Sequence, residues 1–222
     1  MTVQNASCSE GANVFQYTYN GTHNDEWLFE VSASTYYKSE AIRYALANYD
    51  NYLNTYPNLS YTVDESANFV SQCFSSGGKK YNDVWYVYKL NNTYLTPQND
   101  TQLNYSWDIY NPSPWTSEVY FYIYWSIYAA HDTFTPADII NNNSATSTVY
   151  GKGDVVQILK WDSTWLDYVG HKTMLVTNVD DPDNKNTFKM TYHSQNTPGR
   201  RLLYICSNYN TSDYRVRFYK IV

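Results

Sequence analysis

The sequence lacks both an excess of basic residues and a long apolar run. Its 222 residues contain 15 Lys and Arg against 21 Asp and Glu, so the formal net charge is −6, and the basic residues form no run. Nucleic acids and anionic membranes attract proteins through basic patches, so we expect neither as a partner. No stretch approaches the roughly 18 to 20 consecutive apolar residues of a membrane-spanning helix, so we expect no membrane span.

Cysteine is scarce, and the sequence motifs of cofactor sites are missing. Cys8, Cys73 and Cys206 allow at most one disulfide, which excludes a dense disulfide framework and leaves open whether Cys8 pairs with Cys206. Paired-cysteine zinc spacing, a Gly-rich phosphate loop and an EF-hand loop are all missing, so we expect neither a metal nor a cofactor. Residues 1–4 resemble an initiator before a trimmed mature start, and we expect a secreted protein whose signal peptide has been removed.

Aromatic residues, in contrast, are abundant. The chain has 26 Tyr, 7 Trp and 8 Phe, which is 18% of its residues. That content excludes a disordered chain, and the length allows a sizeable hydrophobic core. Tyr and Trp rings pack in cores but also stack on sugars and peptides. The composition therefore favours a core role and leaves a role in substrate binding open.

The order of the predicted elements indicates an α+β protein. We expect an N-terminal extension over residues 1–33 and one domain over 34–222, with an aromatic-rich insertion at about 80–150. Apolar residues at helical spacing predict helices from Ser34 or Thr35 to before Pro57, at Ser66–Phe74 and at Trp115–Tyr128. Helices followed by strands are typical of helices packed on an antiparallel sheet. The predicted strands are Val155–Lys160, Lys172–Val179, Thr187–Tyr192, Leu202–Cys206 and Val216–Ile221.

Three polar residues can be brought together by these elements. His171 begins one predicted strand, and His193 follows the next, at the head of a polar tip that includes Asn196. Because the start of one strand of a hairpin lies beside the end of its partner, the two histidines are expected to be neighbours. Ser66, a small hydroxyl residue, begins the second helix. A nucleophile, a base and an orienting group can thus be placed in order, although a histidine at a strand end is more often structural.

Two segments carry a resemblance to a known family. The segment Tyr37–Ala45 (YKSEAIRYA) resembles the opening helix of the bacterial putative amidase domain family, whose members begin Tyr-x-Arg/Lys-x-x-Ala-x-x-Tyr-Ala. The segment Glu65–Cys73 (ESANFVSQC), followed by Gly77-Gly78, resembles that family's Asp-Cys-Thr/Ala-Asn-Phe-Val-Ser-Gln signature. The similarity spans about residues 36–205 in the same order. Its later parts are Ser106-Trp107, Gly153–Val156, Trp161-Asp162, Gly170-His171 and Tyr192–Ser194.

The resemblance implies a papain-like fold and a cysteine-type amidase or peptidase. In that superfamily of cell-wall amidases and peptidases, a cysteine at a helix start attacks an amide carbonyl, and a histidine on the first strand acts as base. Carried over to this chain, residue 66 is the nucleophile position and His171 the base. His193 orients the base, with Asn196 as its rival. The implied substrate is a peptide, in the first place a peptidoglycan stem peptide, and the resemblance makes no prediction of the oligomeric state.

The chain departs from the family at the nucleophile, because Ser66 stands where the family has cysteine. One explanation is a deliberate Cys-to-Ser change, which leaves the enzyme inactive or slow. The other is a natural serine, in an inactive relative or an unusual serine hydrolase. Cys73 lies two turns along the helix and is interpreted as a small buried residue. Two further functions stay open. They are a catalytically dead module that binds wall glycan or peptide through residues such as Trp85, Trp107, Trp115 and Trp165, and a toxin that cleaves a host protein amide.

Overall fold

The computed structural model describes residues 2–3, 14–15, 36–60, 65–193 and 196–222. The chain divides into two units, Met1–Ala33 and Ser34–Val222. In the first unit, strands β1 (Thr2–Val3) and β2 (Val14–Phe15) pair in antiparallel fashion. The second unit contains all the other elements.

A six-stranded antiparallel sheet forms the centre of the second unit. Its order is β5-β10-β6-β7-β8-β9, so the last strand of the chain lies between β5 and β6. Strands β6 and β7 form a long hairpin in which Gln157 lies opposite Thr173. The strands are β5 (Ala130–Phe134), β6 (Val155–Asp162), β7 (Asp167–Asn178), β8 (Lys189–Tyr192), β9 (Thr197–Arg201) and β10 (Tyr214–Lys220).

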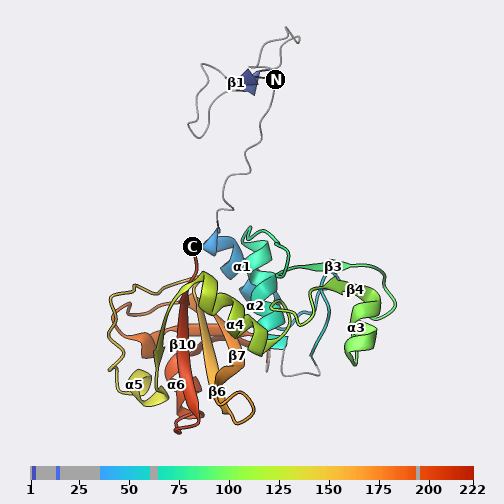
Figure 1. Ribbon diagram of the computed structural model, residues 1–222. Coiled ribbons are helices and arrows are strands. Elements are labelled where there is room, and N and C mark those ends of the chain that lie inside the picture. Colours follow the sequence, from blue (N-terminus) through green and yellow to red (C-terminus); the bar gives the residue numbers. More distant parts are fainter. Residues whose placement is uncertain (1, 4–13, 16–35, 61–64, 194–195) are drawn as a thin grey trace. The chain divides into compact units, whose positions relative to one another are not determined.

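Helices cover both faces of this sheet (Figure 1). Helices α1 (Lys38–Asn48), α2 (Glu65–Ser76) and α4 (Glu118–Tyr128) contact β7 from one face. The opposite face carries α5 (Pro136–Ile140), α6 (Leu202–Ser207) and the short 3-10 helix η3 (Lys185–Thr187). A separate two-stranded sheet, formed by β3 (Val87–Lys89) and β4 (Trp107–Ile109), accompanies α3 (Asp100–Ser106). The expected α+β class with an antiparallel sheet is confirmed.

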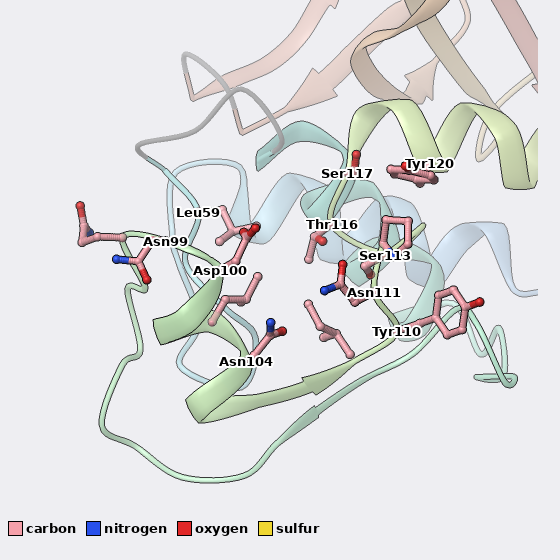
Figure 2. Close-up of a pocket in the computed structure, with 14 residues that line it drawn as sticks. Leu59, Asn99, Asp100, Asn104, Tyr110, Asn111, Ser113, Thr116, Ser117 and Tyr120 are labelled. Atoms are coloured by element: carbon pink, nitrogen blue, oxygen red, sulfur yellow. The ribbon is translucent and has the colours of Figure 1, made fainter. Parts of the chain in front are cut away.

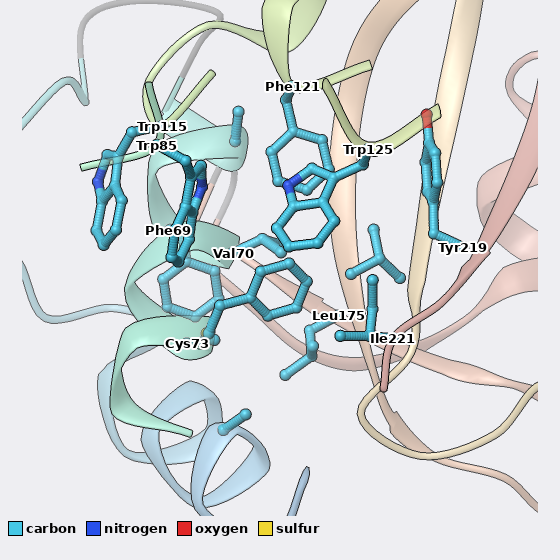
Figure 3. Close-up of a cluster of buried hydrophobic side chains, with 14 of the residues drawn as sticks. Phe69, Val70, Cys73, Trp85, Trp115, Phe121, Trp125, Leu175, Tyr219 and Ile221 are labelled. Carbon is cyan, nitrogen blue, oxygen red and sulfur yellow. The ribbon is translucent and has the colours of Figure 1, made fainter. Parts of the chain in front are cut away.

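Part of the aromatic surplus of residues 80–130 lies in the core cluster that α1, α2 and α4 form with the sheet, while Tyr88, Tyr105, Tyr110 and Tyr128 are exposed. Figure 3 shows Trp85 beside Trp115 and Phe121 beside Trp125 in this cluster. The rings pack edge to face or tilted, with the Trp85 and Trp115 centroids 4.6 Å apart, as aromatic clusters prefer. Trp85, Trp107 and Trp115 are buried, so the expectation that they line a binding cleft is wrong. Trp165, by contrast, is 51% exposed.

The strand predicted at Leu202–Cys206 is wrong, because these residues begin helix α6. Leu202, Ile205 and Cys206 are its buried residues, and their spacing of three and four places them on one helical face.

Within the described ranges, no helix is long and apolar enough to cross a bilayer.

Candidate functional site

Ser66 lies in the first turn of α2 and is only 1% exposed. Its Oγ donates a hydrogen bond to Oε1 of Glu118, the first residue of α4. The same Oγ accepts a hydrogen bond from the backbone N–H of Thr173 in β7, at 3.2 Å. Two helices and the central sheet therefore meet at this hydroxyl.

Glu118 is held by a buried polar network. Its Oε2 accepts hydrogen bonds from Thr173 Oγ1 and from Gln157 Nε2, the latter at 3.2 Å. Gln157 also donates to the backbone carbonyl of Glu118 at 2.9 Å and accepts from the hydroxyl of Tyr219 at 3.0 Å. Because Gln157 and Thr173 are opposite residues of the β6–β7 ladder, both side chains point to the same face. The network fixes the Glu118 carboxylate against Ser66.

Gly170 allows β7 to approach this network closely. A Cβ atom at this position would lie 1.9 Å from the Glu118 carbonyl oxygen and 2.5 Å from Gln157 Nε2. Backbone occupies that space, so no other residue fits without moving α4. Close packing against α4 thus explains why the Gly170-His171 motif has a glycine at its first position.

His193, which follows β8, belongs to a second buried cluster, at the start of helix α2. Its Nδ1 lies 2.5 Å from Glu65 Oε1, and its Nε2 lies 2.6 Å from the carbonyl oxygen of Asn48. Its ring stacks on Phe69, with the ring centroids 4.0 Å apart, and packs on Tyr52, with the centroids 4.4 Å apart. Since a carbonyl oxygen only accepts, Nε2 carries a hydrogen. Both ring nitrogens are thus engaged, Nδ1 with Glu65, the residue that precedes Ser66, and neither with Ser66 itself.

His171 lies on the other face of the sheet. Leu159 pairs with Gly170 and Ile158 pairs with Lys172, so His171 is the extra residue of a β-bulge. Its ring contacts Tyr209 and Tyr214, which pack on the core cluster of the α6 face. Burial, helped by the charges of Lys160 and Lys172, lowers its pKa below the ordinary 6.5.

Asn196 is exposed, and its Oδ1 accepts a hydrogen bond from the hydroxyl of Tyr52 at 3.4 Å. Of the four predicted site residues, Ser66 and His193 both lie at the N-terminal end of α2, but in separate hydrogen-bond networks. Within the described residues, neither histidine is hydrogen-bonded to Ser66. The structure does not bring the predicted base, His171, to the nucleophile position.

Two cysteines are free thiols in the described part of the chain. Cys73 and Cys206 are both fully buried. Burial raises the pKa of the Cys73 thiol well above its usual range and raises that of Cys206 to about 12. Buried thiols of this kind are poor nucleophiles, which agrees with the structural role expected of Cys73. Cys8 lies outside the described residues.

A pocket of about 270 Å³ lies between α3 and residues 109–120. Figure 2 shows Asp100 and Asn104 of α3 on one side and Thr116 and Ser117 on the other. Ser117 directly precedes Glu118, and the pocket is thereby adjacent to the polar network along the chain. No group of three His, Cys, Asp or Glu side chains capable of holding a metal ion occurs among the described residues.

Sequence reasoning missed Glu118, Thr173 and Gln157. The available signal was a lone carboxylate and a lone amide in apolar segments, Glu118 before VYFYIYW and Gln157 within VVQIL. A polar residue predicted to be buried needs a partner, and these two are partners. Their separation of 39 residues hides the pairing from local patterns.

Comparison with known proteins gives one finding. Residues 35–219 match the sequence model of a family described as Putative amidase domain. No curated protein and no solved structure matches the chain.

Proposed function

The chain belongs to the putative amidase domain family, and from this premise and the site geometry we propose that it hydrolyses an amide bond with Ser66 as nucleophile. The observation that carries the proposal is the hydrogen bond from Ser66 Oγ to the Glu118 carboxylate. A nucleophile bonded to a base that other groups orient is the arrangement that activates a hydroxyl.

Glu118 serves as the proton acceptor in the proposed reaction. Ser66 Oγ attacks the carbonyl carbon while its proton passes to Glu118, and the resulting tetrahedral oxyanion collapses as the C–N bond breaks. Glu118 returns the proton to the departing amine. Water then attacks the acyl ester and gives its proton to Glu118, and as the bond between the acyl carbon and Ser66 Oγ breaks, Glu118 returns this proton to Oγ, which releases the carboxylic acid and restores Ser66. The backbone N–H groups in the first turn of a helix have no acceptor within the helix, so those of α2 are suited to stabilise the oxyanion.

A carboxylate beside residue 66 suits serine better than cysteine. A negative neighbour raises a thiol's pKa and so disfavours the thiolate that a cysteine enzyme needs. The cysteine-type alternative, with a papain-like fold and with His171, His193 and Asn196 completing the site, requires His171 to reach residue 66 from the opposite face. The Glu118 arrangement requires no such rearrangement.

A peptide in the bacterial cell wall is the proposed substrate, with the protein acting outside the cell. The resemblance to cell-wall amidases supports this choice. The negative net charge is compatible with a substrate that is not recruited by a basic surface.

The test compares three forms of the protein on purified peptidoglycan and on short peptides, with new primary amines measured by a fluorogenic reagent. The Ser66 form should release amines and Ser66→Ala should not. Activity confined to Ser66→Cys would favour the cysteine-type alternative. Release by none of the three forms would overturn amide hydrolysis.

A second candidate function is a catalytically dead binding module. The burial of Ser66 favours it, since its Oγ is closed to an outside molecule in this structure. This candidate predicts that the Ser66 and Ser66→Ala forms bind purified walls equally and that neither cleaves them. A co-sedimentation assay with both forms measures this directly.

A further inference from the structure

The described lining of the pocket beside α3 carries a negative charge with no positive charge to balance it. Among the described residues that line it, Asp100 is the one charged side chain, and neither Lys, Arg nor His is present (Figure 2). An anionic group would be repelled there, whereas a cation would be attracted. The volume of about 270 Å³ lies just below the roughly 300–1,000 Å³ of typical small-molecule sites, so it suits one residue-sized group.

The polar side chains around Asp100 are available to a ligand. Among the described residues, no hydrogen bond or ion pair engages the side chains of Asp100, Asn104 or Asn111. Asn99 differs, since its side chain caps α3 through the N–H of Gln102. A carboxylate and two amide oxygens supply the three acceptors that a primary ammonium group can use.

The pocket is connected to the proposed site through two neighbouring residues. Leu59, in its wall, donates its backbone N–H to Glu65 Oε2 at 2.8 Å, and Glu65 directly precedes Ser66. Ser117, also in the wall, directly precedes Glu118. The pocket wall is therefore linked to Ser66 through Leu59 and Glu65, and to Glu118 through Ser117.

We propose that this pocket binds an amine-bearing side chain of a peptide substrate and that the Asp100 carboxylate selects it. The inference rests on the proposed function for its placement beside a reactive centre. It adds the substrate class, which is a peptide with a primary amine on a residue near the scissile amide. The ammonium group pairs with Asp100, and its aliphatic stem packs on the apolar side chains of Leu103 and Ile109.

The test is a binding measurement that needs no hydrolysis. Titration calorimetry at low salt compares acetyl-Ala-Gln-Lys-Ala-amide with the same peptide carrying norleucine in place of lysine. The lysine peptide should bind about two- to fivefold more tightly, a preference of the size that one exposed ion pair provides. Asp100→Asn should abolish the preference. Asp213→Asn, which removes one exposed carboxylate elsewhere, should retain it.

Equal affinities for the two peptides, failure of both to bind, or a preference that survives Asp100→Asn would each overturn the assignment of the pocket. The result is separable from the proposed function. A preference that depends on Asp100 in a protein that cleaves nothing would leave the pocket standing and remove the hydrolase. Amide cleavage by a protein that binds both peptides equally would support the hydrolase and remove the assignment of the pocket.

Discussion

Glu65 and His193, 128 residues apart, form a buried pair whose Oε1 and Nδ1 atoms are 2.5 Å apart. The other carboxylate oxygen of Glu65 accepts from the N–H of Leu59, and Nε2 of His193 lies against the carbonyl of Asn48. The pair thus ties the end of α1, the start of α2 and the end of β8 together. It positions the helix turn that carries Ser66, and we assign it a structural role.

Replacing His193 with Phe should therefore destabilise the fold strongly. The ring stacking on Phe69 is retained, but the Glu65 carboxylate loses its buried partner, a change that typically costs 3–5 kcal/mol. We expect the free energy of unfolding to fall by about 3 kcal/mol in urea titrations. The matched control is His131→Phe at an exposed position, and equal losses in the two variants would contradict the structural role of the pair.

The base assignment predicts a selective loss of activity in Glu118→Gln. The amide keeps the size of the carboxylate but cannot take the Ser66 proton, and loss of a general base typically costs 10²–10⁴-fold in rate. We expect kcat for amine release to fall at least about 100-fold, measured on the substrate that the Ser66 form cleaves. Glu40→Gln, which removes an exposed carboxylate paired with Arg43, is the control. Loss of activity in His171→Gln together with full activity in Glu118→Gln would transfer the role of base to His171.

Local sequence patterns predicted the helices and strands of this site better than the contacts between its side chains. The helix at Ser66–Phe74 is confirmed as α2, because its apolar spacing and the Gly77-Gly78 stop are both local signals. The hairpin of β7 and β8 is confirmed as well. Glu118 could not be assigned to Ser66, since 52 residues separate them and it is the packing of α4 on β7 and on α2 that brings them together.

The side of the sheet on which His171 lies was unpredictable for a different reason. Strict alternation along β7 would place residues 171, 173 and 175 on one face, the face of α2. The bulge at His171 shifts the alternation by one, so that Gly170 and Thr173 face the helices and His171 faces Tyr209. The local sign of this bulge is Gly170, since a glycine inside a strand often marks one, but it does not identify His171 as the extra residue.

Gly170 offers a test of the close packing between β7 and α4. Gly170→Ala places a methyl group against the Glu118 carbonyl and should lower the free energy of unfolding by about 2 kcal/mol, within the range for overpacking. Gly151→Ala is the matched control, because a Cβ there meets nothing within 4 Å. We expect that variant to stay within about 0.5 kcal/mol of the wild type. Similar stabilities for the two variants in thermal or urea unfolding would show that α4 can move away from β7 without cost.

His171 should make stability depend on pH in the mildly acidic range. Its pKa is lowered in the folded state by burial and by Lys160 and Lys172, so the unfolded chain takes up the proton first as the pH falls. The stabilising contribution of the neutral ring is complete above the unfolded pKa of about 6.5 and is lost as the pH falls through the lower folded value. His171→Phe keeps a ring against Tyr209 and Tyr214 and removes the titration. We therefore expect the wild type to lose more stability than His171→Phe between pH 7 and pH 5, measured by urea titration at each pH. Parallel pH profiles for the two proteins would contradict the half-buried, neutral state of His171.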